Sequence, residues 1–142
     1  MADRTLIFVK PDGVRRGLAG EIISRFERKG LRIAALKMMR FTRELARRHY
    51  EEHLGKPFYP ALEEFVLSGP VVAMVLEGND VVEMTRMMMG KTKHTEAAPG
   101  TIRGDFAYHT TFNLIHGSDS TERANIEIAN FFSEEELMPV CV

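Results

Sequence analysis

The chain alternates short apolar runs with segments whose apolar residues recur at helical spacing. A continuous apolar run between turn-forming residues predicts a buried strand, and apolar positions three or four apart with a cap predict a helix. The expected strands are residues 5–9, 31–39, 71–77 and 113–116. The expected helices are a segment around 22–29 that stops at Gly30, then 42–53, 61–67, 80–89 and 121–132, with a capping box of Ser133 and Glu136 in a short tail.

The order of these elements predicts the fold class. Along the chain it is β-α-β, a helical insert, β-α-β and a final helix. This order is typical of an α/β (α+β) domain with a ferredoxin-like, split-βαβ arrangement, in which helices flank a four-stranded antiparallel sheet. Because no Ser/Gly linker or low-complexity tract divides the chain, residues 1–142 are expected to form a single domain.

Two segments fall outside this regular pattern. The residues Pro11, Asp12 and Gly13 predict a turn after the first strand. Residues 91–112 show no strong period, and a loop that long in a compact domain usually has a functional or interface role. A long functional loop is therefore expected directly before the last strand.

Composition and charge exclude several classes of protein. Apolar residues make up 44% and charged residues 27% of 142, which is typical of a globular protein and not of a disordered or fibrous chain. With 19 Lys and Arg against 20 Asp and Glu, the net charge of −1 indicates neither a membrane nor a specific nucleic-acid partner. The single Cys141 cannot form an internal disulfide, and the apolar run 6–9 is too short for a secretory signal, so a cytoplasmic protein is expected.

The segment NLIHGSDS, residues 113–120, holds the most informative side chain. His116 follows an apolar run and precedes small polar residues, two of which, Asp119 and Ser120, can cap the next helix. A neutral imidazole at the end of a strand is a good nucleophile at neutral pH. These residues alone are equally consistent with a histidine that merely closes a strand.

A set of phosphate-seeking side chains accompanies His116. Lys10 follows the first strand, Arg86 lies on the helix before the long loop, and Thr92 and Arg103 lie within that loop. Two guanidinium groups and one ammonium group can offset the charge of a triphosphate, and arginine can bind phosphate in a bidentate manner. Their positions at the ends of elements favour a shared ligand site.

Three other patterns were weighed against this interpretation. Gly90-Lys91-Thr92 is similar to the end of a phosphate-binding P-loop, but position 85 is Thr where that loop needs glycine. The segment HYEEH, residues 49–53, matches an H-x-x-E-H zinc signature, yet a polar, partly exposed helix face produces the same letters. The methionines at 38–39 and 87–89 are interpreted as core filling and not as ligands.

Four separated segments resemble one enzyme family, nucleoside diphosphate kinase, over essentially the whole chain. They are KPDG at 10–13, GPVVA at 69–73, PGTIRGDF at 99–106 and NLIHGSDS at 113–120. The resemblance implies a Mg²⁺-dependent, ping-pong transfer of the γ-phosphoryl group from a nucleoside triphosphate, typically ATP, to a diphosphate. His116 would carry the group as phosphohistidine.

The same resemblance implies roles for further residues. Glu127 would fix the ring of His116, with Ser118 and Tyr50 beside it, and Phe58 would stack on the base. Lys10, Arg86, Thr92 and Arg103 would face the phosphates, and Asn113 with Lys10 the sugar hydroxyls. Stacking discriminates weakly between bases, so broad base and sugar tolerance is expected. The Mg²⁺ ion would be coordinated mainly by the nucleotide phosphates and not by protein ligands. The chain would form a homo-oligomer, a hexamer in preference to a tetramer.

The chain departs from the common family pattern in three places. Thr111 and Phe112 stand where many members have Gly-Arg, His94 where many have proline, and Phe131 where tryptophan is common. None of them removes a matched catalytic residue, so the departures bear on loop packing, assembly and stability.

A non-catalytic ferredoxin-like module that binds nucleotides or nucleic acid is the alternative from another class. It would be expected to show a basic, aromatic-rich sheet face, and the net charge of −1 argues against it. Transfer of the phosphoryl group to other proteins is a further side activity that the sequence leaves open.

Overall fold

The computed structural model describes residues 3–139 and contains a four-stranded sheet with the order β2-β3-β1-β4. The strands are β1 (Asp3–Val9), β2 (Arg32–Met39), β3 (Val71–Gly78) and β4 (Ile115–Gly117). All neighbouring pairs are antiparallel. The predicted ferredoxin-like α+β fold is confirmed, while Cys141 lies outside the described residues.

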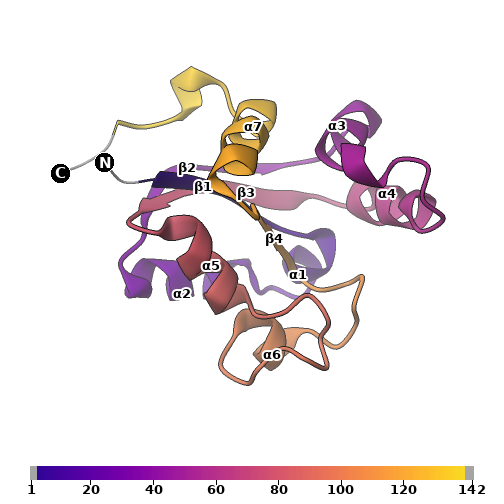
Figure 1. Cartoon of the computed structure of the whole chain (residues 1–142), viewed down its shortest axis with the longest axis horizontal. Coiled ribbons are helices and arrows are strands. Elements are labelled where there is room, and N and C mark those ends of the chain that lie inside the picture. Colours follow the sequence, from indigo (N-terminus) through magenta and orange to yellow (C-terminus); the bar gives the residue numbers. More distant parts are fainter. Residues whose placement is uncertain (1–2, 140–142) are drawn as a thin grey trace.

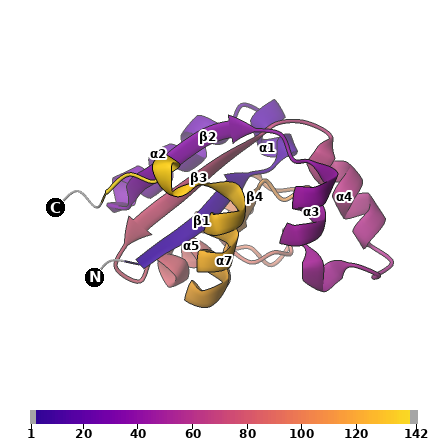
Figure 2. The same cartoon turned by 90° about the horizontal axis from the view of Figure 1, so that it is seen from above.

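Helices cover both faces of this sheet (Figures 1 and 2). They are α1 (Pro11–Arg15), α2 (Ala19–Lys29), α3 (Arg43–His49), α4 (Tyr59–Leu67), α5 (Val81–Met89), α6 (Ile102–Phe106) and α7 (Thr121–Phe131), with 3₁₀ turns at Glu51–His53 and Glu134–Glu136. Helices α3 and α7 lie on one side of the sheet, and α2, α5 and α6 lie on the other. Within residues 3–139, no helix has the length and apolar character needed to cross a membrane.

The alternation of side chains along β1 divides the core into two layers. Leu6 and Phe8 are buried among residues of α3, α4 and α7, whereas Ile7 and Val9 are buried against α2 and α5. Successive side chains of a strand point to opposite faces, so a strand with helices on both sides is apolar throughout. This explains why residues 5–9 form an unbroken apolar run.

The structure corrects three of the predicted elements. The expected turn at Pro11–Gly13 is instead the first turn of α1, where Pro11 occupies a favourable N-terminal position. The expected helix 42–53 ends at His49, and Tyr50, with φ −101° and ψ 30°, leads into a 3₁₀ turn. The long loop contains α6, which Thr101 caps by accepting a hydrogen bond from the backbone N–H of Gly104.

The prediction that the methionines at 38–39 and 87–89 fill the core is wrong for Met38 and Met87. Met89 is buried, but Met87 and Met38 are each 62% exposed. Met38 lies on β2, an edge strand of the sheet, which also exposes Leu36 at 48%. Pattern alone missed this because an edge strand with one covered face gives the same apolar letters as a central strand.

Gly104→Ala tests how tightly α6 is packed. A Cβ atom at Gly104 would overlap the carbonyl of Ala98, so the substitution should lower the free energy of unfolding by roughly 1–3 kcal/mol. Gly20→Ala is the matched control, because a Cβ atom there meets nothing within 4 Å and alanine is the better helix former. Urea unfolding measures both variants, and equal stability of the two would contradict the tight contact.

Candidate active site

The register of β1 and β4 determines where the His116 side chain points. His116 pairs directly with Phe8, so both side chains lie on the face that carries α3 and α7. The two rings stack with their centroids 4.9 Å apart, and the ring of His49 from α3 packs edge-on at 4.5 Å. Two aromatic contacts from different elements therefore fix the plane of the His116 ring.

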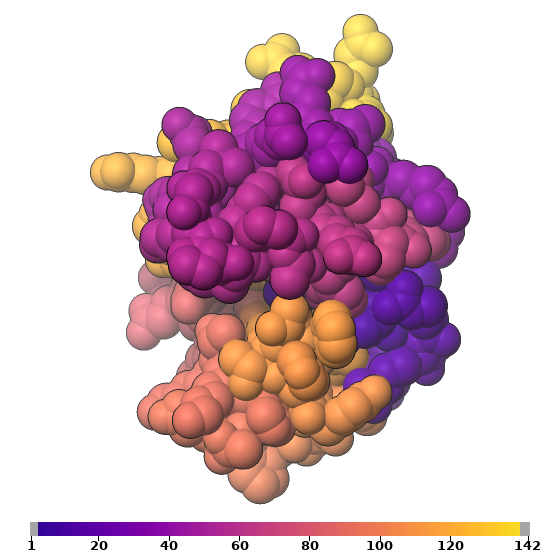
Figure 3. Space-filling view, turned by 90° about the vertical axis from the view of Figure 1, so that its right-hand side faces the viewer, coloured from indigo at the N-terminus to yellow at the C-terminus, as the bar shows by residue number. Residues whose placement is uncertain are grey.

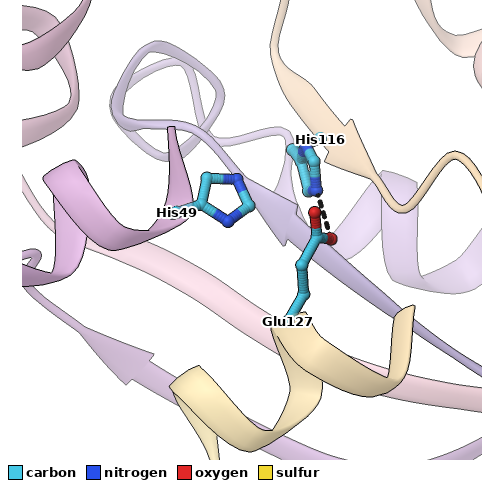
Figure 4. A group of neighbouring side chains, drawn as sticks. All are labelled: His49, His116 and Glu127. Atoms are coloured by element: carbon cyan, nitrogen blue, oxygen red, sulfur yellow. Dashed lines mark hydrogen bonds and ion pairs between the residues drawn. The ribbon is translucent and has the colours of Figure 1, made fainter. Parts of the chain in front are cut away.

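Glu127 of α7 also fixes the orientation of the His116 ring (Figure 4). His116 Nε2 lies 2.9 Å from Glu127 Oε1, which also accepts a hydrogen bond of 2.7 Å from Ser118 Oγ. A carboxylate only accepts hydrogen bonds, so Nε2 carries the ring proton and Nδ1 keeps its lone pair. Although burial opposes it, the hydrogen bond to His116 holds the pKa of Glu127 at about 2.

The His116 ring is neutral at physiological pH. Burial lowers its pKa from the usual 6.5, Glu127 opposes this shift, and the charges of Lys10 and Arg103 add to it. An imidazole that is deprotonated at Nδ1 and hydrogen bonded at Nε2 is the form that can attack an electrophile. The geometry thus prepares a nucleophile and not only a strand-closing residue.

A strained residue directs the chain into β4. Leu114 has φ 78°, a left-handed conformation that costs a non-glycine residue on the order of 1 kcal/mol or more. Its amide N–H donates to Asp12 Oδ2 at 3.2 Å, and its carbonyl accepts from the Lys10 N–H at 2.8 Å. The residues at the start of α1 therefore hold the bend that places His116 at the cleft.

A cleft of about 250 Å³ opens beside His116. Figure 3 shows a crevice between the segment of α3 and α4 and the long loop. The residues that line the cleft include seven of the predicted site residues, namely Lys10, Arg86, Thr92, Arg103, Asn113, His116 and Glu127. Elements that are far apart in sequence thus meet around one space.

The cleft is strongly cationic. Arg103 is buried and donates to the carbonyls of Asn113, Gly90 and Ile115 at 3.3, 3.0 and 2.7 Å, and Arg86 donates to the carbonyl of Gly117 at 3.3 Å. Within residues 3–139, neither arginine forms an ion pair with a carboxylate, and nor does Lys10. Two arginines and one lysine without an ion-pair partner among the described residues, placed beside a nucleophile, are suited to a polyanionic substrate such as a triphosphate.

Lys10 is the most perturbed of these cations. Its Nζ atom donates to Asn113 Oδ1 at 2.8 Å, and Asn113 in turn donates to the carbonyl of Thr110 at 2.8 Å. Burial first, and the charge of Arg103 second, lower the pKa of Lys10 to about 7, while Asp12 opposes the shift. An anion in the cleft would favour the charged form again, so Lys10 is suited to a phosphate group.

The other predicted site residues lie around this cleft. Ser118 is fully buried behind Glu127, and Tyr50 lines a smaller adjoining cavity together with His116. Burial raises the pKa of Tyr50, so its hydroxyl stays protonated. Phe58 is 51% exposed and packs edge-on against His53, a residue of the cleft wall, with centroids 5.3 Å apart. Thr92, which lines the cleft itself, is exposed.

Three residues of the site were missed by the sequence analysis. His49 was interpreted as part of a polar, partly exposed helix face, but it is 4% exposed and touches the His116 ring. Arg123 donates to Glu127 Oε2 at 3.0 Å, and its spacing of four from Glu127 on a helix was the available signal. Asp119 was considered only as a helix cap, yet it lines the cleft.

His49, His116 and Glu127 also have the composition of a metal site. Their donor atoms lie within 4.8 Å of one another. However, Oε1 of Glu127 already bonds His116 and Ser118, and Oε2 bonds the guanidinium of Arg123. A resident cation would have to displace these partners beside a fixed positive charge, so the cluster fits a positioning network better than a metal centre.

Comparison with known proteins shows the family of this chain. The profile of the family "Nucleoside diphosphate kinase" matches residues 3–137. A nucleoside diphosphate kinase of Thermus thermophilus is 62% identical over 136 residues, which is 96% of this chain and 99% of that protein. One of Desulforamulus reducens is 59% identical over 96% of this chain and 91% of that protein.

Solved structures give the same result. A halophilic nucleoside diphosphate kinase from Halobacterium salinarum in complex with CDP has a TM-score of 0.97 and 49% identity, covering 100% of this chain and 95% of that one. The nucleoside diphosphate kinase of Aquifex aeolicus has a TM-score of 0.94 and 46% identity, covering 97% and 100%.

Fold and family match together identify a phosphotransferase. The chain belongs to the nucleoside diphosphate kinase family, as its resemblance in four sequence segments indicated. The predictions of the family and of the enzyme class are therefore confirmed.

The perturbed Lys10 should make stability depend on pH. Its pKa is about 7 in the folded protein and 10.5 ordinarily, so between these values the unfolded chain binds more protons and stability rises with pH. Lys10→Met should therefore be more stable than the wild type near pH 6–7, by on the order of a few kcal/mol, and this gain should shrink toward pH 10.

Urea unfolding of both proteins across this pH range measures the difference. Lys93→Met, which removes an exposed lysine that forms no ion pair among the described residues, controls for the substitution itself. A stability gain of Lys10→Met that does not change with pH would contradict the burial effect.

Proposed function

We propose that this chain transfers the γ-phosphoryl group of a nucleoside triphosphate, typically ATP, to a nucleoside diphosphate through phosphohistidine at His116. The observation that carries the proposal is the pairing of a prepared nucleophile with uncompensated cations in one cleft. His116 Nε2 is bonded to Glu127, which leaves Nδ1 for the reaction, and Lys10 and Arg103 lie beside the ring. The family membership of the chain supports the same reaction.

In the first half-reaction, the lone pair of His116 Nδ1 attacks the γ-phosphorus. An Nδ1–P bond forms while the bond from phosphorus to the bridging oxygen breaks, and the diphosphate leaves with that electron pair. The Nε2 proton stays between the ring and Glu127, which stabilises the positive charge that develops on the imidazole. The second half-reaction is the reverse with another diphosphate, so one site serves both halves in a ping-pong scheme.

The cationic side chains act on the transferring group. Lys10, Arg86 and Arg103 would bind phosphate oxygens and stabilise their charge, and the Thr92 hydroxyl would add a hydrogen bond. Because the backbone carbonyls around Arg103 fix its guanidinium, little reorganisation would accompany the reaction.

The residues of the cleft are compatible with Mg²⁺ that binds together with the nucleotide. The walls carry three cations and one exposed carboxylate, Asp119, beside the buried Glu127, so the nucleotide phosphates would hold the ion and Asp119 would face its hydration shell. When bound, Mg²⁺ neutralises phosphate charge and orients the phosphates.

The remaining contacts explain a broad substrate range. Phe58, half exposed at the rim, would stack on the base, and stacking discriminates little between bases. Lys10 and Asn113, already joined by a hydrogen bond, would meet the sugar hydroxyls. Ribose and deoxyribose nucleotides of any base should therefore be accepted.

A purely binding module would have no need for the proton arrangement at His116 and Glu127.

We also infer the setting in which the enzyme works. Leu36 and Met38 are exposed on β2, the end strand of the described sheet, and both features favour a homo-oligomer, since exposed apolar side chains and a free strand edge are normally covered. A hexamer, or else a tetramer, stays the prediction from the family. The match of the family over residues 3–137 supports a single domain over residues 1–142. The single cysteine and the need for ATP support a cytoplasmic location.

The role of His116 is tested by intact-protein mass. After brief incubation with Mg²⁺ and ATP, the wild type should gain one phosphoryl group that is lost in acid and discharged by a second nucleoside diphosphate. His116→Ala should bind nucleotide and remain folded but gain no mass. A stable adduct on His116→Ala would place the nucleophile elsewhere, and nucleotide binding without any adduct on the wild type would favour the binding module.

Phosphate contacts should contribute more to kcat/KM than base stacking does. Arg103→Ala should lower kcat/KM by roughly a hundredfold or more, because it removes charge stabilisation from the transition state. Phe58→Ala should lower it by roughly tenfold, the loss of one base stack. Steady-state assays with ATP and several diphosphates measure both variants, and equal losses would contradict this division of roles.

A further inference from the structure

Arg123 connects the two elements that hold the His116 ring. From α7, its Nε donates to Glu127 Oε2 at 3.0 Å, and its Nη2 donates to the backbone carbonyl of His49 at 2.8 Å. The side chain is 20% exposed and the carboxyl group of Glu127 only 4%. The guanidinium of Arg123 thus bonds both Glu127, whose carboxylate accepts the Nε2 proton of His116, and His49, whose ring packs against that of His116.

We propose that Arg123 is a positioning residue of the phosphoryl transfer, which holds Glu127 and His49 in the places that orient the nucleophile His116. The inference rests on the role of His116 proposed above. It adds a residue that forms no hydrogen bond with His116 within residues 3–139 and that lines the adjoining cavity but not the cleft of about 250 Å³.

The contact with Glu127 fixes the carboxylate from its far side. Oε1 bonds His116 and Ser118, and Oε2 would have no other side-chain partner among the described residues without Arg123. A carboxylate bonded at one oxygen can rotate about its last torsion, whereas one bonded at both oxygens cannot. Arg123 therefore limits how far the acceptor of the Nε2 proton can move.

The contact with His49 has a different consequence. His49 ends α3, and its ring lies in a pocket of Phe8, Tyr50, Phe131 and His116, with its Nδ1 buried and unpartnered within residues 3–139. Neutral His49 can lie against His116, but a charged one would repel the ring as it becomes cationic. Burial first, then His116 and Arg123, hold the pKa of His49 well below 6.5 against the opposing charge of Glu127.

The electrostatic effect has a definite sign. Glu127, Lys10 and Arg103 act most strongly on the pKa of the His116 ring, and His49 packs against it. The other charged or titratable side chains of the same cleft are Arg86, His53 and Asp119. Removal of the Arg123 cation leaves the charge of Glu127 less compensated, so both imidazoles should bind protons more readily. The variant should thus raise the pKa of His116 and His49, in addition to loosening the ring.

The chain provides a closely matched control. Arg4 of β1 also donates its Nε to a buried carboxylate, Glu77 Oε2 at 2.8 Å, and its Nη2 to a backbone carbonyl, that of Met138 at 2.9 Å. Its side chain is 26% exposed, close to the 20% of Arg123. Arg4 lies near the start of β1, and Lys10 follows the other end of that strand. Arg4→Met therefore removes the same kind of contact without touching the network around His116.

The experiment compares wild type, Arg123→Met, Arg123→Lys and Arg4→Met by quenched-flow with Mg²⁺ and ATP. Arg123→Met should form phosphohistidine roughly tenfold or more slowly at saturation, while the ATP concentration for half-maximal rate changes little. Arg123→Lys, which keeps the charge but lacks the planar, widely spaced donors of the guanidinium, should be intermediate. Arg4→Met should react at the wild-type rate. NMR titration of the histidines without nucleotide should show the raised pKa of His116 in Arg123→Met only.

Other outcomes would overturn the inference. A wild-type rate and an unchanged His116 pKa in Arg123→Met, or an equal slowing in Arg4→Met, would reduce Arg123 to a structural ion pair. Failure of the wild type itself to form phosphohistidine would instead refute the proposed role of His116. The NMR titration does not depend on turnover, so it tests the contact of Arg123 with the network even in that case.

Discussion

The hydrogen bond between Glu127 and His116 is the interaction on which the rest of the site depends. It fixes the proton on Nε2, which leaves Nδ1 as the nucleophile, and it supplies the negative charge that stabilises the ring when it becomes cationic. The carboxylate can do this only because it is buried and bonded by Ser118 and Arg123 as well. The cations of the cleft would otherwise dominate the electrostatics of the ring.

Sheet geometry places this pair where it can act. Because His116 is opposite Phe8 in the pairing of β1 with β4, its ring faces α7 and not α5. A shift of one residue in the register would turn the imidazole to the opposite layer, away from Glu127. The strained Leu114 and its bonds to Lys10 and Asp12 hold that register at the point where the chain leaves the loop.

Much of the fold was predictable from the sequence, and the errors have local causes. The apolar run of β1 and the stop of α2 at Gly30 were clear because burial on two faces and a left-handed C-cap leave strong patterns. The helix predicted over 42–53 was too long, since the break at Tyr50 depends on burying His49 and Tyr50 against the sheet, a tertiary effect that local pattern does not contain. The short α6 was missed because a five-residue helix has too few turns to show a period.

The sequence by itself determined the family, the fold class and seven of the residues that line the cleft, because four separated segments carry side chains whose types and order match one chemistry. Only the tertiary structure decided which ring nitrogen is free, that His49 lies against the nucleophile, and that Arg123 joins α7 to the end of α3. These facts depend on distances between residues that are far apart in the chain. Spacing along a sequence does not specify them, because packing across the sheet sets which side chains meet.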